Sequence, residues 1–176
     1  MSAICGASEA RPTMDAIWAA LAAIPDPEIP VISLVELGVV RDVCWRDGAL
    51  VVTLTPTYSG CPATDVIAAD VAAALADAGI AGARIETRLS PAWTTDWIAP
   101  AAKRRLAEYG IAPPLARSAV QAIDVAGLRR RELPPVACPR CGSLRTRELS
   151  RFGSTPCKAQ HRCEACLEPF DYFKPH

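Results

Sequence analysis

Histidine is almost absent from the sequence, and its scarcity limits the catalytic chemistry that the chain could perform. The 176 residues include only two histidines, His161 and His176, and the first 160 residues contain none. A nucleophilic cysteine or serine needs a neighbouring base, which is most often a histidine. Papain-type catalysis by a cysteine in the first 160 residues is therefore poorly supported.

Long apolar runs and a net charge are also missing. No run approaches the roughly 18 apolar residues that crossing a membrane requires. Residues 1–12 have neither the basic nor the apolar stretch of a secretory signal, and no membrane association is expected.

Basic and acidic residues balance at 19 each. Residues 1–126 carry nine basic and fourteen acidic side chains, whereas residues 127–176 carry ten and five. This asymmetry predicts two modules, but the basic excess is too small to indicate nucleic-acid binding.

Cysteine, by contrast, is abundant, with eight residues in the chain. Without an export signal, this number indicates a reducing compartment, the cytoplasm, where thiols bind metals or undergo redox chemistry. Four of the cysteines form two CxxC knuckles, Cys138–Cys141 and Cys163–Cys166, with 21 residues between them. Two knuckles can complete a tetrahedral four-sulfur cage, which suits one structural zinc ion or a single iron ion. A pair of disulfides, or redox-active knuckles, is the alternative interpretation.

The spacing of apolar and turn residues predicts the order helix–strand–strand–helix–strand. Three prolines between Pro25 and Pro30 end the first helix, and Asp47-Gly48 favours a hairpin between the first two strands. A right-handed crossover then joins the second and third strands, so the sheet is mixed. We expect helices over 13–23 and 62–78, strands over 37–45, 49–55 and 83–89, and a short helix containing Lys103, Arg104 and Arg105.

The predicted fold class is α+β: a small mixed three-stranded sheet with helices on one face, followed by a separate β module. We expect a disordered tail over 1–12, the α+β domain over 13–110, a linker rich in Pro, Ala and Arg over 111–135, and a zinc ribbon with the two knuckles over 136–176.

Cys61 has the most distinctive setting of the remaining cysteines. Pro62 is suited to the first position of a helix, which would make Cys61 the N-cap. Free N–H groups and the positive end of the helix dipole would favour a thiolate there. The position also follows a strand of a parallel crossover, where ligands often bind. A small buried cysteine that fills a gap between helix and sheet is the alternative. We expect no functional role for Cys44, which lies on a strand, or for Cys5, which lies in the tail.

Two further groups could accompany Cys61. Asp26 and Glu28 flank Pro27 on a rigid turn, and they could be metal or cluster ligands or could simply accept hydrogen bonds from nearby backbone N–H groups. Thr55 and Thr57 could donate hydrogen bonds to a thiolate or a bound sulfide, or order their loop.

Cys157 lies between the two knuckles, where a four-sulfur site needs no further ligand. Its neighbour Lys158 could lower its pKa and keep the thiol reactive. Cys157 could also replace a knuckle cysteine as a ligand, or only pack inside the ribbon.

Three segments resemble the SufT-like domain family, which is linked to iron–sulfur cluster assembly. They are Asp26-Pro-Glu-Ile-Pro-Val-Ile-Ser33, Glu36-Leu-Gly-Val-Val-Arg-Asp42 and Thr55-Pro-Thr-Tyr-Ser-Gly-Cys-Pro62, and the resemblance covers about residues 13–100. The C-terminal part of the chain extends this resemblance, through Phe152-Gly-Ser-Thr155, Cys157-Lys-Ala159 and the run from Cys163 to Phe173. Taken together, nearly the whole chain is similar to the PaaD (also PaaJ) family. These are the D subunits associated with phenylacetyl-CoA 1,2-epoxidase in aerobic bacterial phenylacetate degradation.

This resemblance implies a non-catalytic accessory factor that helps to place a [2Fe–2S] cluster in the reductase component. It also implies that Cys61 is the functionally critical residue, with Asp26, Glu28 and Thr55 around it. Our hypothesis is that the Cys61 thiolate transiently holds iron or a [2Fe–2S] cluster. The implied partners are the oxygenase and reductase subunits. Because all-cysteine clusters use four ligands, a second copy in a homodimer, a client cysteine or Cys157 would have to contribute. A zinc-ribbon adaptor for proteins or nucleic acid that carries no cluster, and a thiol-redox enzyme, are the alternatives.

Overall fold

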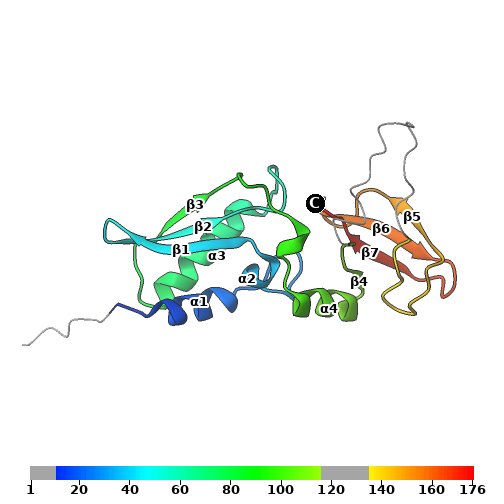
Figure 1. Ribbon diagram of the computed structural model, residues 1–176, viewed down its shortest axis with the longest axis horizontal. Helices are drawn as coiled ribbons and strands as arrows, with labels where there is room; N and C mark the ends of the chain where they lie inside the picture. Colours follow the sequence, from blue (N-terminus) through cyan, green and yellow to red (C-terminus); the bar gives the residue numbers. More distant parts are fainter. Residues whose placement is uncertain (1–10, 116–134) are drawn as a thin grey trace, which may run out of the picture.

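The computed structural model describes residues 11–115 and 135–176, and it consists of an α+β domain beside a small β domain (Figure 1). The expected tail with Cys5 and most of the expected linker lie outside the described residues. The first domain and the helix that follows it contain α1 (Met14–Ala22), α2 (Leu34–Leu37), β1 (Val40–Arg46), β2 (Ala49–Leu54), α3 (Thr64–Asp77), β3 (Arg84–Thr87), a 3-10 turn (Thr95–Trp97) and α4 (Pro100–Tyr109).

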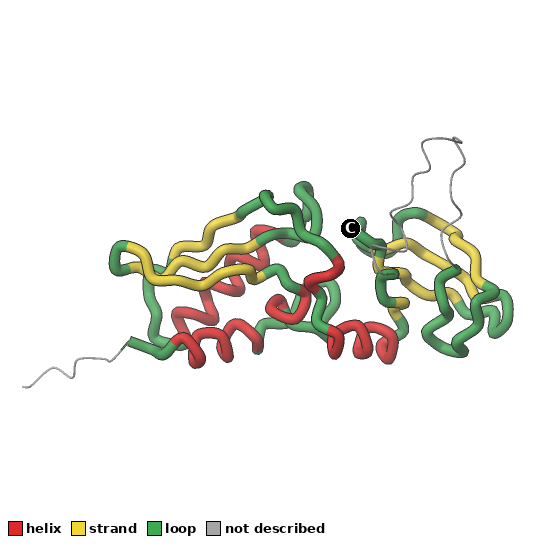
Figure 2. Tube along the Cα trace, viewed as in Figure 1, coloured by secondary structure: helices red, strands yellow, loops and turns green. Residues whose placement is uncertain are grey.

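The sheet of the α+β domain is mixed, as the sequence predicts. β1 and β2 pair in antiparallel orientation around Asp47 and Gly48, whose φ angles of 49° and 80° form the expected hairpin turn. β2 and β3 are parallel, with α3 as the crossover, and both α1 and α3 lie on the same side of the sheet (Figure 2). The fully buried Leu21 of α1, Val71 of α3 and Val52 of β2 belong to one continuous core.

The short helix α2 replaces the beginning of the strand expected from residue 37. Ser33 Oγ accepts a hydrogen bond from the Glu36 N–H (3.2 Å), and Glu36 Oε2 accepts one from the Ser33 N–H (3.1 Å), which is a complete capping box. Gly38 ends the helix in the left-handed conformation. The spacing Ser-x-x-Glu was visible in the sequence and would have revealed this helix.

Gly38 is also the position where a side chain would be most costly, because two effects coincide there. Its φ is +78°, and an added Cβ would lie 2.8 Å from Trp97 Cβ. We expect Gly38→Ala to lower the free energy of unfolding by on the order of 3 kcal/mol, through left-handed strain and overpacking together. Gly48 has a φ of +80° but no atom within 4 Å of the added Cβ, so Gly48→Ala should show the strain alone, about 1 kcal/mol. Equal losses for the two variants in urea denaturation would contradict the contact with Trp97.

The second domain is a four-stranded sheet with the order β4-β7-β6-β5. Its strands are β4 (Ile111–Ala112), β5 (Thr146–Ser150), β6 (Lys158–Cys163) and β7 (Pro169–Phe173). β4 follows α4 after Gly110 and pairs in parallel with β7. Ile111 and Ala112 were expected in the linker, so part of that segment completes the sheet of the ribbon.

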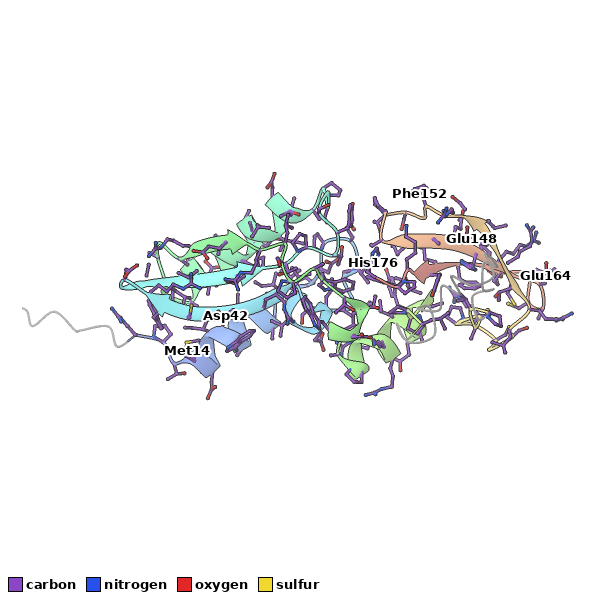
Figure 3. The ribbon with its side chains drawn as sticks, turned by 45° about the horizontal axis from the view of Figure 1, so that its top comes forward. Met14, Asp42, Glu148, Phe152, Glu164 and His176 are labelled. Carbon is purple, nitrogen blue, oxygen red and sulfur yellow. The ribbon has the colours of Figure 1, made fainter. Side chains whose placement is uncertain are left out.

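The two domains pack against each other at the C-terminal end of β7. Phe173 and Cys157 belong to the hydrophobic core of the α+β domain, whereas Phe170 and Tyr172 belong to a separate cluster within the ribbon. The ring centroids of Trp93 and Phe173 are 6.0 Å apart. The Thr95 N–H donates a hydrogen bond to the carbonyl of His176 (3.3 Å). His176 lies between the two domains (Figure 3). Within residues 11–115 and 135–176, no helix is long and apolar enough to cross a membrane.

Candidate metal centre and thiol site

The four knuckle cysteines converge at the far end of the ribbon, as their spacing predicts. Their sulfur atoms all lie within 4.8 Å of one another, and no other comparable group of metal-ligating side chains occurs among the described residues. Cys138 Sγ is 3.8 Å from Cys166 Sγ, and Cys141 Sγ is 3.6 Å from Cys163 Sγ. A tetrahedron with metal–sulfur bonds of about 2.3 Å has edges of about 3.8 Å. Disulfide bonds of about 2.05 Å are not formed, so the geometry fits a resident structural metal.

The backbone of the second knuckle donates hydrogen bonds to one of its two sulfur atoms. The N–H groups of Ala165 and Cys166 approach Cys163 Sγ at 3.4 and 3.5 Å. The hydrogen bond from Cys166, with that from Ala165, lowers the pKa of the Cys163 thiol to about 6. The residues after the knuckles, Gly142 and Leu167, both have left-handed φ angles, 73° and 67°. All four ligand positions of the cage are supplied by the chain, as in structural rather than catalytic sites.

A second cluster lies at the junction of the two domains. The side chains of Asp26, Glu28, Cys61 and Cys157, with Thr57, line one small cavity whose remaining walls are mainly apolar. Asp26 and Glu28 come from the turn after α1, Cys61 from the loop between β2 and α3, and Cys157 from the ribbon turn before β6. The structure therefore brings Cys61 together with three of the four residues that were expected near it, Asp26, Glu28 and Cys157. Thr55 lines an adjoining cavity instead.

The two carboxylates of the cavity have different surroundings. Asp26 is 6% exposed, and its Oδ1 accepts hydrogen bonds from the N–H groups of Glu28 (2.9 Å) and Ile29 (2.8 Å). Burial raises the pKa of Asp26, although these N–H groups oppose the shift. Burial and then the charge of Asp26 raise the pKa of Glu28. Asp26 is thus fixed by the backbone of its turn, while Glu28 faces the thiol of Cys157, which donates to its Oε2 at 4.0 Å.

Cys61 differs from the expected thiolate at a helix N-cap. α3 begins at Thr64 with Ala63 as its N-cap, so Pro62 is not the first helical residue and Cys61 lies two residues before the cap. Burial raises the pKa of the half-buried Cys61 thiol, and nearby Glu28 and Asp26 raise it further. The backbone N–H of Ala63 lowers that pKa, as the helix argument anticipates, but the effect is smaller than that of burial.

Cys157 also has a raised pKa, and it does not join the knuckles. Its side chain is 4% exposed, with Thr155 Oγ1 3.0 Å from its sulfur. Burial raises the pKa of this thiol; Thr155 and Lys158 oppose the shift. Lys158 was expected to lower the pKa, but its ammonium group is paired with Asp171 at 3.2 Å and its effect is outweighed.

The raised pKa of Cys61 gives a measurable pH dependence. Only the thiolate is alkylated, so we expect Cys61 to react with iodoacetamide more slowly at pH 7 in the folded protein than in the denatured chain. The rate should keep rising at pH values above the ordinary pKa of a cysteine. Mass spectrometry of the Cys61 peptide measures both rates. Faster reaction of the folded protein at pH 7 would instead indicate the thiolate that the helix argument predicts.

Two family models match successive parts of the chain. The one described as an iron–sulfur cluster assembly protein matches residues 14–86, and the one described as the PaaD zinc beta ribbon domain matches residues 124–174. The two matches thus define an iron–sulfur cluster assembly domain joined to a zinc-ribbon domain.

The chain belongs to the PaaD family, the D subunits of phenylacetyl-CoA epoxidase. It is 47% identical to the putative D subunit of the 1,2-phenylacetyl-CoA epoxidase of Escherichia coli (strain K12), with 96% of each chain covered. It is also 35% identical to an Fe-S protein maturation auxiliary factor of Porphyromonas gingivalis (strain ATCC BAA-308 / W83), over 49% of this chain and 83% of the relative. A solved domain of unknown function, DUF59, from Bacillus anthracis matches with 29% identity and a TM-score of 0.49, covering 52% of this chain and 89% of that chain.

Proposed function

We propose that this protein is a non-catalytic accessory factor that delivers iron, or a [2Fe–2S] cluster, to the reductase component of a phenylacetyl-CoA epoxidase complex. The observation that carries the proposal is the cavity in which Cys61 lies with Asp26, Glu28 and Cys157. The names of the relatives support it, because one is a subunit of such an epoxidase and another is a maturation factor for Fe-S proteins.

Cys61 is the proposed contact with the cargo. It is the more accessible of the two thiols in the cavity, and it follows the exposed residues Ser59 and Gly60 of its loop. Its raised pKa keeps the thiol protonated at neutral pH when no cargo is bound. Loading then releases a proton and unloading takes one up, because thiolate is the ligating form.

The ribbon metal has a separate, structural role in this proposal, and we propose zinc as its identity. Four cysteine ligands leave no open position for chemistry, and the site lies in the ribbon's own cluster with Cys138 and Cys163 buried. The metal would fix the ribbon sheet, and through that sheet the turn that carries Cys157.

An adaptor that docks partner proteins without carrying cargo is the second candidate function. The ribbon exposes the large apolar side chains Leu149, Phe152 and Leu167, and Figure 3 shows Phe152 on the outside of the ribbon. Such side chains could contact a partner whether or not a cluster is carried.

Metal analysis separates the two functions. We expect the anaerobically purified protein to contain about one zinc per chain together with iron, with or without acid-labile sulfide, and to transfer that iron to the metal-free reductase. Zinc alone, with no iron bound after incubation with ferrous salt, would contradict the delivery role and favour the adaptor.

A further inference from the structure

We propose that the groove beside the Cys61 loop is the docking site of the client protein, and that it receives a client segment with a large apolar side chain among carboxylates. This junction groove is lined by residues 55–59, Leu89, Ala92, Trp93 and His176. The inference rests on the proposed function, in which the reductase is the client. It adds the surface that brings the client to the thiol and the chemistry of the segment that binds there.

The junction groove lies next to the cavity that contains Cys61. Pro56 and Thr57 line both of them and form a common wall. Tyr58 of the groove and Cys61 are the two ends of one turn, because the Cys61 N–H donates a hydrogen bond to the Tyr58 carbonyl (3.2 Å). A segment bound in the groove would therefore lie within one turn of the residue that is proposed to hold the cargo.

The floor of the junction groove is fixed before any partner binds. Trp93 is buried, and its Nε1 donates a hydrogen bond to the Leu37 carbonyl (3.1 Å). Its ring meets the ring of His176 edge-on, with the centroids 6.0 Å apart. The groove encloses about 360 Å³, near the lower end of the roughly 300–1,000 Å³ of binding pockets. It therefore suits a few side chains of a segment, and a preformed groove lowers the entropy cost of binding them.

Two large apolar side chains stand exposed at the groove, one from each domain. Leu89 of the α+β domain lines it and is 54% exposed. Phe152 of the ribbon is 69% exposed, and Lys174 Nζ lies 4.9 Å from the centroid of its ring. Figure 3 shows Phe152 and His176 at the end of the ribbon that faces the α+β domain. Aromatic and aliphatic side chains held in this way can anchor a partner.

Three basic side chains flank these apolar ones. Arg88 is exposed and directly precedes Leu89. Arg151 is exposed and directly precedes Phe152, and Lys174 Nζ donates a hydrogen bond to the Arg151 carbonyl (3.1 Å). Among the described residues, none of the three cations lies within 4.0 Å of a carboxylate oxygen.

The acidic side chains of the same two segments do not neutralise this charge, because each has a cation of its own. Glu86 pairs with Arg46 at 3.3 Å, and Asp171 pairs with Lys158 at 3.2 Å. The surface that complements the groove is therefore apolar at its centre and acidic around it. Three cations around a leucine and a phenylalanine fit a protein segment better than nucleic acid, which is held by a longer track of phosphate contacts.

The test is the affinity of the zinc-loaded, full-length protein for the metal-free reductase, measured by isothermal titration calorimetry. We expect Leu89→Ala and Phe152→Ala each to weaken binding at least fivefold, because each removes an apolar anchor. Leu144→Ala is the matched control. Leu144 is 58% exposed, but it lies three residues after Cys141 at the other end of the ribbon, and this variant should bind as the wild type does.

Charge reversal tests the acidic character of the client segment. Arg88→Glu and Arg151→Glu should each weaken binding about threefold or more at low salt. The loss should shrink at high salt, because salt screens charges at a surface. Arg104→Glu is the matched control, since Arg104 is an exposed arginine of α4, and α4 lies on the opposite side of the junction from the loop between β2 and α3 (Figure 1).

The outcomes separate docking from delivery. Cys61→Ala should bind the reductase as the wild type does and deliver nothing, whereas Leu89→Ala should deliver at the wild-type rate once the reductase is saturating. Wild-type affinity in Leu89→Ala, Phe152→Ala and both charge reversals would overturn the docking site while leaving delivery through Cys61 intact. A wild type that binds the reductase through the groove but carries no iron would support the docking site and overturn delivery.

Two other occupants of the groove would also overturn the inference. Analytical ultracentrifugation would reveal a second copy of the chain, as a dimer that Leu89→Ala dissociates. Binding of a short DNA duplex that is lost in Arg88→Glu and Arg151→Glu, with no binding of the reductase, would instead assign the groove to nucleic acid.

Discussion

Replacing Cys61 by alanine is expected to abolish delivery of iron or cluster to the reductase while leaving the fold and the ribbon metal unchanged. The thiol lies at the accessible side of the cavity that it shares with Asp26, Glu28 and Cys157, and alanine removes the only ligand atom of the residue. Cys61 is a small, half-buried side chain, so its truncation should cost about 1 kcal/mol of stability or less. Formation of the holo-reductase from the metal-free reductase, followed by its visible absorption, should fall at least tenfold.

The control for this prediction is Cys44→Ala, which also removes a half-buried thiol. Cys44 pairs with Val51 within the sheet and does not line the cavity. This variant should deliver as the wild type does, and both variants should retain about one zinc per chain. Full delivery by Cys61→Ala would show that the thiol is only a packing residue, and the proposed function would then have to be given up.

Loss of the ribbon metal is expected to unfold the ribbon and leave the α+β domain folded. Within the part of the chain that the structure describes, the ribbon's own cluster contains only seven buried residues, and modules of about 40 residues rarely fold without a metal or disulfides. Zinc binding in comparable peptides contributes about 10–16 kcal/mol. Either Cys138→Ser or chelation should therefore remove hydrogen-exchange protection from β5 and β6. Protection of β1, β2 and α3 should persist, because their core contains Phe173 and Cys157 of the ribbon but none of the residues in that cluster.

Loss of the ribbon metal should also change the reactivity of Cys157 at the domain junction. Cys157 is held by contacts to β7 and to residues just after it, so an unfolded ribbon would release its thiol. We expect alkylation of Cys157 to accelerate at least tenfold after chelation and to slow again when zinc is restored to the wild type, but not to Cys138→Ser. Unchanged exchange and unchanged Cys157 reactivity after complete removal of the metal would contradict a structural role for the site.

The features that the sequence predicts well are those determined by residues near one another in the chain. The hairpin at Asp47-Gly48, the first helix and the parallel crossover follow from local patterns and connection lengths. Convergence of the two CxxC knuckles follows from their spacing and from the need of a metal for four ligands. Even α2 carried a local signal, in the pair Ser33 and Glu36.

The features that could not be predicted depend on contacts between distant parts of the chain. The sign of the pKa shift at Cys61 is determined by burial of the thiol, which helix geometry alone does not reveal. The meeting of Cys157 with Glu28 results from packing of the ribbon on the α+β domain. No periodicity or motif specifies that packing, so the sequence offered Cys157 only as one of three possible partners of Cys61, and the structure places both in one cavity. Thr55, placed nearby by resemblance, faces an adjoining cavity instead.

The pairing of β4 with β7 has a consequence for how such a protein can evolve. The ribbon sheet is incomplete without Ile111 and Ala112, which directly follow α4 and Gly110. Helix α4 is itself anchored to the α+β domain, because Arg105 Nε donates a hydrogen bond to the Val31 carbonyl (3.0 Å). At the other end, Phe173 belongs to the core of that domain. A gene fusion that placed a different zinc ribbon after α4 would lose both the shared strand and the shared core residue. The two parts are therefore not exchangeable modules, and their sequences are expected to vary together across the family.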